Sequence, residues 1–247
     1  MSASLRPRRV LVTGAASGIG ASTAARFRAA GDRVAGVDRD AEALQMVELD
    51  VRATGDVSDE GSVRAAVDET ARALGGLDVL VSAAGVAGRG NVADLDAAEW
   101  DRVFAINVRG LFLTAKHAIP HLRNAGGGSI INLASQLGLV AAPDAAAYCA
   151  SKGAAIQLTR AMAIDHATDG ITVNAICPGP TATPMLDAYF DGSDDPDAER
   201  ADFEATMLTG RFVQPEEIAE AAFYLAHPAA RSTTGAVLVV DAGYVIR

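Results

Sequence analysis

Short apolar runs rich in valine and isoleucine alternate with longer segments of helical pattern along almost the whole chain. The first such runs are Arg9–Thr13, Arg33–Val37 and Leu77–Ser82, and helical patterns occupy Ile19–Ala30 and Glu60–Leu74. Strands separated by helices of this length need right-handed crossover connections, which place the strands parallel in one sheet. The third run has three consecutive apolar residues at its centre, as expected where helices cover both faces. We therefore predict an α/β fold with a doubly wound parallel sheet.

The same alternation continues to the end of the chain. A further strand is expected within Val47–Thr54, and later strands at Ser129–Ala134, Ile171–Ile176 and Ala236–Val240. Helices are expected at Glu99–Arg123 with an interruption near Pro120, at Ala145–Ala167 and at Glu216–Leu225. A length of 247 residues suits one α/β domain, and no repeat or linker divides the pattern. We predict a single domain over residues 1–247.

The charge of the chain argues against two classes of partner. With 31 acidic and 21 basic residues it carries a formal charge of -10, which repels nucleic-acid phosphates and anionic lipid. No apolar run approaches the roughly 20 residues that span a bilayer, and none resembles a signal-peptide core. Cys149 and Cys177 are the only cysteines, so there is no disulfide framework. We expect a cytoplasmic protein without nucleic-acid or membrane partners.

A glycine-rich turn joins the first predicted strand to the first helix. Its residues Thr13-Gly14-Ala15-Ala16-Ser17-Gly18-Ile19-Gly20 have the spacing Gly-x-x-x-Gly-x-Gly. Glycines let a pyrophosphate approach the backbone, and the free N–H groups and dipole of the helix N-terminus attract its charge. Taken alone, such a sequence is often only a turn. Beside a second strand that ends in an acidic residue, it predicts a dinucleotide site made by Gly14, Ser17, Gly18, Ile19 and Gly20.

That acidic residue is Asp38. A carboxylate at this position accepts hydrogen bonds from the hydroxyls of the adenosine ribose and repels the 2′-phosphate of NADP. Arg39 follows it and favours NADP, but Ser17 adds no positive charge, so we predict NAD. Asp56, with Val57, is expected at the adenine edge after the third strand. Asp50 is a competing candidate for this contact, and the choice stays open.

Tyr148 and Lys152 are four residues apart in a helical segment and therefore share one helix face. A neighbouring ammonium lowers the pKa of a tyrosine, so this pair is suited to acid/base chemistry near neutral pH. Ser135 follows a predicted strand, where active-site groups of open α/β sheets gather, and its hydroxyl is placed to hold a substrate oxygen. A lone Tyr-x-x-x-Lys is commonly only a surface pair.

Together these motifs resemble the short-chain dehydrogenase/reductase family, from about Arg9 to Gly243, in its single-domain Rossmann-like form. The resemblance implies that Tyr148 is the catalytic acid/base, Lys152 its activator and ribose ligand, and Ser135 the group that polarises the carbonyl. It implies that Asn107 holds a water in a proton relay. It also implies a homotetramer with interface helices at Glu99–Arg123 and Ala145–Ala167. It further assigns cofactor contacts to Ala84, Gly85, Pro178, Gly179, Thr181 and Thr183.

Two departures from the family pattern are visible. The family often carries Asn-Asn-Ala-Gly where this chain has Ser82-Ala83-Ala84-Gly85, so two side-chain amides are missing. Thr181 stands where the family often has an aliphatic residue, although its backbone remains available to a carboxamide. Neither departure removes the small residue needed for close approach at Gly85.

The function expected from these residues is NAD-dependent interconversion of a secondary alcohol and a ketone by hydride transfer, with a small molecule as substrate. Two other classes stay open. A nucleotide-sensing protein without enzyme activity would need only the dinucleotide half. Epimerisation or enoyl reduction on the same scaffold usually needs a longer substrate domain or a wider spacing between tyrosine and lysine. A metal site at His117 and His121 is not expected, because Pro120 disturbs their spacing and no third ligand is near.

The segment 184–212 is predicted to form a mobile substrate lid, because its Asp-Gly-Ser-Asp-Asp-Pro centre cannot continue a helix. An apolar wall over the substrate is expected from Met185, Leu186, Tyr189, Phe190, Phe203 and Met207. The centre of the lid is acidic, and Arg200 and Arg211 are the only cations expected near it. Both features favour a neutral and mainly apolar substrate. The acids of that centre are Asp191, Asp194, Asp195 and Asp197.

Overall fold

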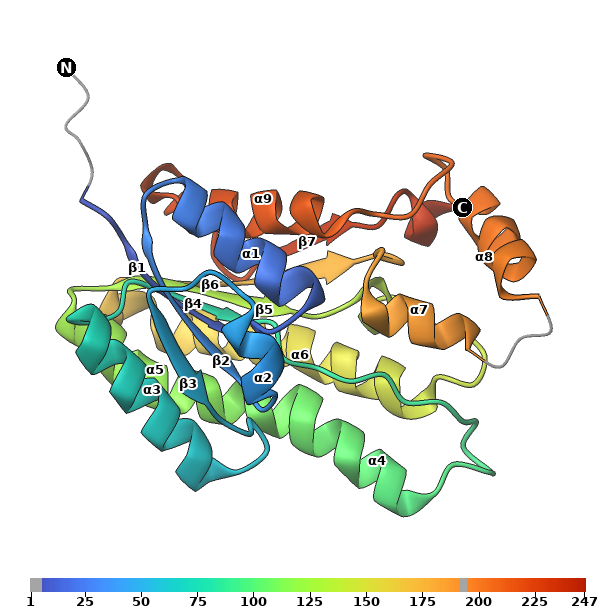
Figure 1. Cartoon of the computed structure of the whole chain (residues 1–247), viewed down its shortest axis with the longest axis horizontal. Coiled ribbons are helices and arrows are strands. Elements are labelled where there is room, and N and C mark those ends of the chain that lie inside the picture. Colours follow the sequence, from blue (N-terminus) through green and yellow to red (C-terminus); the bar gives the residue numbers. More distant parts are fainter. Residues whose placement is uncertain (1–5, 192–194) are drawn as a thin grey trace.

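The computed structural model describes residues 6–191 and 195–247. At its centre lies one sheet of seven parallel strands in the order β3-β2-β1-β4-β5-β6-β7 (Figure 1). The strands are β1 (Arg9–Thr13), β2 (Arg33–Asp38), β3 (Val51–Thr54), β4 (Val79–Ser82), β5 (Gly128–Leu133), β6 (Ile171–Pro178) and β7 (Val237–Val240).

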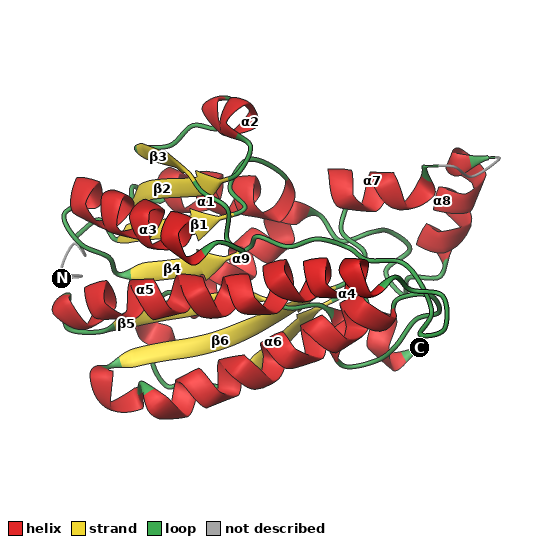
Figure 2. Ribbon diagram, turned by 90° about the horizontal axis from the view of Figure 1, so that it is seen from below, coloured by secondary structure: helices red, strands yellow, loops and turns green. Residues whose placement is uncertain are grey.

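Helices cover both faces of the sheet, which confirms the predicted fold class. On one face α1 (Gly18–Ala29) packs beside α9 (Pro215–Leu225). The other face carries α3 (Glu60–Leu74), α5 (Leu111–Asn124) and α6 (Ala146–Asp165), which lie side by side in Figure 2. The short α2 (Ala41–Gln45) connects β2 to β3, and α7 (Pro184–Phe190) and α8 (Pro196–Ala205) lie beyond the carboxyl ends of the strands.

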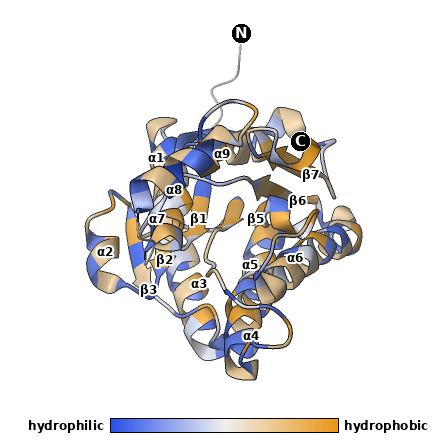
Figure 3. Cartoon of the chain, turned by 90° about the vertical axis from the view of Figure 1, so that its right-hand side faces the viewer, coloured by the Kyte–Doolittle hydropathy of each residue, from blue (hydrophilic) through white to orange (hydrophobic). Residues whose placement is uncertain are grey.

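Side chains at alternate positions of the strands pack into two separate apolar layers. Leu11, Leu80 and Ile130 are fully buried in the layer under α3, α5 and α6, whereas Val12 and Val81 are buried in the layer under α1 and α9. The strands are apolar on both sides for this reason. Figure 3 shows the hydrophobic strands in the middle of the molecule, surrounded by helices whose colour alternates between polar and apolar.

The long helix predicted at Glu99–Arg123 is continuous but not regular. It begins as α4 (Ala97–Phe104), passes through a π-helical segment (Ala105–Gly110) and continues as α5. The predicted interruption near Pro120 is wrong, since Pro120 lies inside α5, where its neighbours Ala118 and Ile119 are buried in the core. Leu122, on the other side of the proline, is also buried, so packing on both sides outweighs the one backbone hydrogen bond that Pro120 cannot donate.

The segment 184–212 folds into α7 and α8, and residues 192–194, including Asp194, lie outside the described residues. Phe190, Met207 and Phe212 are buried together in a third, small apolar cluster, with Leu186 and Phe203 packed against it. These side chains therefore pack on one another, and their closing over a substrate stays a prediction. Met185 and Tyr189 stay exposed.

Candidate active site

The turn after β1 brings three backbone segments into contact where no side chain fits. Gly14 has a φ of +67°, and a Cβ atom there would lie 2.7 Å from Cα of Ala84. A Cβ atom on Gly20 would lie 1.9 Å from the carbonyl oxygen of Gly14. Ser17 precedes α1 in an extended conformation, and its side chain does not cap the helix. The first N–H groups of α1 are thus free of a side-chain cap and suit a phosphate group.

A cavity of about 360 Å³ opens over this turn. It runs from the end of β2 past the loops after β3 and β4 to the start of α7, so its walls come from distant parts of the sequence. Its bare backbone and its course from the end of β2 to the loop after β4 suit a dinucleotide. The predicted cofactor residues that line it are Gly14, Ser17, Gly18, Ile19, Gly20, Asp38, Asp56, Val57, Ala84, Gly85 and Thr183.

Asp38 is held in place by two backbone groups at the mouth of this cavity. Its Oδ2 accepts a hydrogen bond from the N–H of Ala16 at 3.0 Å, and its Oδ1 accepts one from the N–H of Asp40 at 3.0 Å. Arg39 lines the same cavity and is exposed. The carboxylate is therefore fixed, while the guanidinium beside it is not held by any hydrogen bond or ion pair described for residues 6–191 and 195–247.

The two aspartates left open by the sequence lie at opposite ends of β3. Asp50 precedes the strand, where its carboxylate accepts a hydrogen bond from Val34 and pairs with Arg28 at 3.1 Å. Asp56 follows the strand and lines the cavity. Hydrogen bonds from the hydroxyl and the N–H of Ser58 lower the pKa of Asp56. The position of Asp56 favours it over Asp50 as a cofactor contact.

Ser135, Tyr148 and Lys152 come together next to the cavity. Ser135 follows β5 and is buried, and its Oγ accepts a hydrogen bond from the N–H of Leu137 at 3.1 Å. The Lys152 Nζ lies 5.5 Å from the centre of the Tyr148 ring and donates to the carbonyl of Leu133 at 2.9 Å. This group has a hydroxyl donor, a phenol and an ammonium on two neighbouring elements of the fold.

Burial governs the pKa values of this group. Tyr148 as a whole residue is half-buried, but burial of its phenol group raises the pKa, and the neighbouring Ser135 side chain only partly opposes this. Burial also lowers the pKa of Lys152 to about 8. The expected lowering of the Tyr148 pKa by Lys152 is therefore wrong, because the ammonium is directed to Leu133 and both charged forms are penalised by burial.

The side chain of Asn107 ties the catalytic group to the cofactor cavity. From the π-helical segment its amide bonds the N–H of Val86 at 2.8 Å, the carbonyl of Val86 at 2.9 Å and the hydroxyl of Ser151 at 3.1 Å. A Cβ atom on Gly85 would lie 3.3 Å from Oδ1 of Asn107 and 3.5 Å from Nζ of Lys152. Asn107 thus fixes the loop after β4, and its role in holding a water stays a prediction.

The segment after β6 closes over the glycine turn. Thr181 is buried and donates to the carbonyl of Gly179 at 2.9 Å, and Thr183 donates to the carbonyl of Thr181 at 3.1 Å. The methyl group of Thr183 lies against Gly18, where a Cβ atom would be 3.2 Å away. Pro178 and Gly179 do not line the cavity but place Thr183 there.

Two neighbours of Lys152 escaped the sequence analysis. One is the Leu133 carbonyl, a backbone group that no side-chain pattern reveals. The other is Cys177, whose thiol is close enough for Lys152 to influence it, although burial raises the pKa of this thiol to about 11. Its position before Pro178 at the end of a strand could have indicated it.

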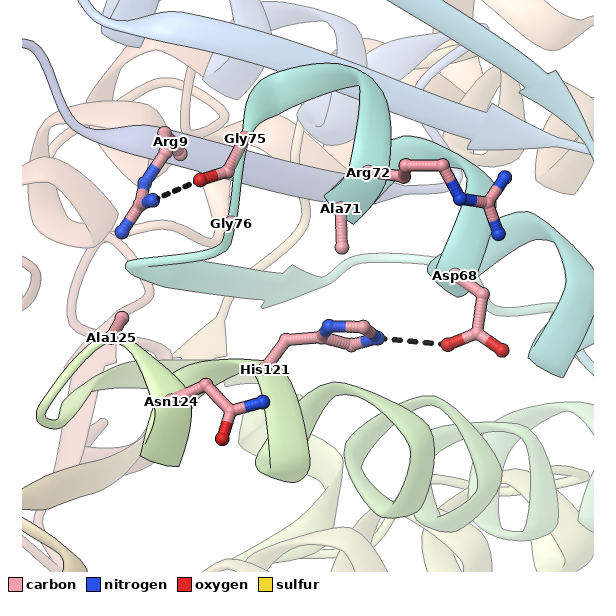
Figure 4. A pocket seen from close by; sticks show the side chains of 9 residues that line it. All are labelled: Arg9, Asp68, Ala71, Arg72, Gly75, Gly76, His121, Asn124 and Ala125. Carbon is pink, nitrogen blue, oxygen red and sulfur yellow. Dashed lines mark hydrogen bonds and ion pairs between the residues drawn. The ribbon is translucent and has the colours of Figure 1, made fainter.

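A second cavity of about 410 Å³ lies at the amino ends of the strands, where β1 begins (Figure 4). His121 pairs there with Asp68 at 2.8 Å, and Arg9 donates to the carbonyl of Gly75. In the part of the chain that is described, no three His, Cys, Asp or Glu side chains are grouped to hold a metal ion. No described helix is long and apolar enough to cross a membrane.

Comparison with known proteins places nearly the whole chain in one group. A family model described as enoyl-(acyl carrier protein) reductase matches residues 14–245. The chain is 43% identical to cis-4-hydroxycyclohexanecarboxylate dehydrogenase of Sinomonas cyclohexanicum over 96% of each chain. It is 39% identical to 2-(R)-hydroxypropyl-CoM dehydrogenase of Xanthobacter autotrophicus, over 96% of this chain and 98% of the relative.

Solved structures agree with these matches. Actinorhodin polyketide ketoreductase with NADPH superposes with a TM-score of 0.93 at 34% identity, over 98% of each chain. A 3-ketoacyl-(acyl-carrier-protein) reductase from Brucella melitensis with NADH has a TM-score of 0.88 at 34% identity, over 96% of this chain and 98% of the other.

The buried ammonium of Lys152 leads to a stability prediction. Lys152→Met should raise the free energy of unfolding by about 1–3 kcal/mol at pH 7, since burial of the charge lowers the pKa well below its unfolded value. The unfolded chain binds more protons between pH 8 and about 10.5, so wild-type stability should recover with rising pH and the difference should shrink. Urea unfolding at pH 7 and pH 9.5 without cofactor measures this. Equal stability of the two proteins at pH 7 would contradict it.

Proposed function

Because this chain belongs to the short-chain dehydrogenase/reductase family, we propose that it interconverts a secondary alcohol and a ketone with NAD as cofactor and Tyr148 as the acid/base. The activity class, oxidoreduction between alcohols and ketones, follows from the relatives. The choice of NAD and the roles of individual residues rest on the geometry of the site. The observation that carries the proposal is the junction at Gly85, where the dinucleotide cavity meets Lys152 and Asn107.

Each residue of the site has a distinct task in ketone reduction. The cofactor, when bound, supplies a hydride to the carbonyl carbon and is thereby oxidised. Ser135 donates a hydrogen bond to the carbonyl oxygen, and Tyr148 gives that oxygen its proton, so that the ketone becomes a secondary alcohol. The raised pKa keeps Tyr148 protonated at neutral pH, ready to act as the acid. The phenolate that remains lies near the Lys152 ammonium, whose Nζ is 5.5 Å from the ring centre, and oxidation runs through the same steps in reverse.

Other chemistries on this scaffold fit the chain less well. Enoyl reduction, which the description of the matching family model names, usually needs a wider spacing than the four residues between Tyr148 and Lys152. A nucleotide-sensing protein would need no Ser135 beside the tyrosine. The proximity of Ser135 to the phenol favours catalysis over sensing.

The catalytic assignment is tested by Tyr148→Phe. This change should reduce kcat at least ~1000-fold and leave NAD affinity within about twofold, because only the proton-bearing oxygen is lost. Turnover of a panel of secondary alcohols is compared with fluorescence titration of NAD. Cys149→Ser, on the adjacent position of the same helix, is the matched control and should keep its activity. Substantial turnover by the Tyr148→Phe enzyme would exclude Tyr148 as the acid/base.

Preference for NAD over NADP rests on Asp38. Its fixed carboxylate at about 4 Å from a 2′-phosphate would cost several kcal/mol at an intermediate dielectric, which outweighs exposed Arg39. Asp38→Asn should narrow the ratio of kcat/KM for NAD to that for NADP by at least about tenfold, whereas Arg39→Gln should widen it. Steady-state kinetics with both cofactors measures the ratios. A wild-type enzyme that prefers NADP would refute the assignment.

We further propose a cytoplasmic homotetramer. Trp100, Phe112 and Ile164 on α4, α5 and α6 are 38%, 46% and 78% exposed, a cost that an interface between helices would remove. Phe112→Asp should shift the sedimentation of the pure protein toward smaller species. A wild-type protein that sediments as a monomer at micromolar concentration would contradict the assembly, and fractionation of the source cells tests the location.

A further inference from the structure

An arginine in the loop after β4 is held in position by a segment distant in sequence. Arg89 lies in the loop after β4, and its guanidinium carbon is 4.1 Å from the centre of the Tyr189 ring on α7. Its Nη2 also donates to the carbonyl of Tyr189 at 2.7 Å. Stacking and a hydrogen bond to one residue fix the plane of the guanidinium.

The position of this pair follows from residues whose place is established. Val86 and Met185 both line the cofactor cavity. Arg89 is three residues beyond Val86, and Tyr189 is one helical turn beyond Met185 on the same face of α7. The contact between Arg89 and Tyr189 therefore joins the continuations of two segments that line the cavity.

A second connection ties this loop to the catalytic helix. The backbone of Gly90 pairs with that of Ala145, and its N–H donates to the carbonyl of Asp144 at 2.8 Å. Ala145 directly precedes α6, whose first turn carries Tyr148. Arg89 is thus adjacent to a backbone bridge that leads within one turn to the reacting phenol.

Arg89 differs from Arg200 and Arg211, the two arginines that the sequence placed near the lid, in having no carboxylate partner among the described residues. Arg200 is paired with Asp187, and Arg211 is paired with Glu217 by both carboxylate oxygens. Arg89 has no carboxylate within salt-bridge distance among residues 6–191 and 195–247. The charge of the lid carboxylate Asp187 is balanced by Arg200, while the charge of Arg89 is not balanced locally.

We propose that Arg89 binds the carboxylate of an anionic substrate, a secondary alcohol whose acid group lies at the end remote from the hydroxyl. The proposal rests on the proposed function. It replaces the expectation of a neutral substrate, which took only Arg200 and Arg211 into account as nearby cations. A fixed guanidinium has N–H groups left beyond the one used by Tyr189, and their planar arrangement matches a carboxylate. Arg89 is in this sense a residue that determines specificity.

Paired substrates test the proposal. The probes are 4-hydroxycyclohexanecarboxylate and 6-hydroxyheptanoate, each compared with its primary amide. The wild-type enzyme should prefer each acid by about 10- to 100-fold in kcat/KM, as expected for a charge-assisted hydrogen-bonded pair. Arg89→Gln should abolish this preference through KM and leave kcat/KM for the amides within about twofold. Arg200→Gln is the matched control and should keep the preference.

Loss of stacking alone would give a different result. If Arg89 only joined the loop to α7, Arg89→Gln would reduce kcat/KM equally for acids and amides, and the proposal would be overturned. An unchanged preference for the acids would overturn it as well. Thermal unfolding of each variant confirms that the exposed substitutions leave the fold intact.

Binding of an unreactive acid separates this proposal from the proposed function. Calorimetric titration of cyclohexanecarboxylate in the presence of NAD should detect binding to the wild type, at least about tenfold weaker binding to Arg89→Gln, and little binding of cyclohexanecarboxamide. Such a result without turnover of any alcohol would support the anion site while the proposed function failed. Turnover of neutral alcohols without carboxylate binding would do the reverse.

Discussion

All seven strands run in the same direction, and this single constraint brings the reactive groups together. Thr13 is in register with Ser82, Ser82 with Asn132, and Asn132 with Ala175. β1, β4 and β5 therefore end within one residue of the same level, and β6 runs three residues beyond Ala175, so the segments that follow all leave the sheet at the carboxyl ends of its strands. Glycines, an acid, a serine and the segment after β6 reach one place because each comes directly after a strand, although up to about 170 positions separate them.

Burial of the Lys152 charge beneath the carboxyl ends of the strands lowers the stability of the protein. The sheet holds Lys152 where water is largely excluded, and the ammonium retains the Leu133 carbonyl as its hydrogen-bond acceptor. The same exclusion of water raises the pKa of the Tyr148 phenol, so the phenol stays protonated at neutral pH. An apolar residue would pack there at lower cost, so the buried lysine fits the role in proton transfer that we propose for it.

The sequence predicted local geometry better than packing between distant segments. The glycine turn, Asp38 and the Tyr148–Lys152 pair were found because strand ends and helix periodicity fix them within a few residues. The direction of the Tyr148 pKa shift could not be predicted from the sequence, because it depends on where the Lys152 ammonium points. Pro120 was given too much weight because the packing of α5 on the core is not visible locally. Arg89 escaped notice since its partner Tyr189 is 100 residues away.

The small cluster around Phe190, Met207 and Phe212 is separate from the two layers that stabilise the sheet. Substitutions in α7 and α8 therefore draw on a different set of contacts from those that keep the cofactor site folded. Such a division lets a lineage vary α7 and α8 while the segments around the cofactor cavity stay under unchanged structural demands. Sequence change in chains of this shape can proceed in these two helices by small steps, without each step threatening the survival of the whole fold.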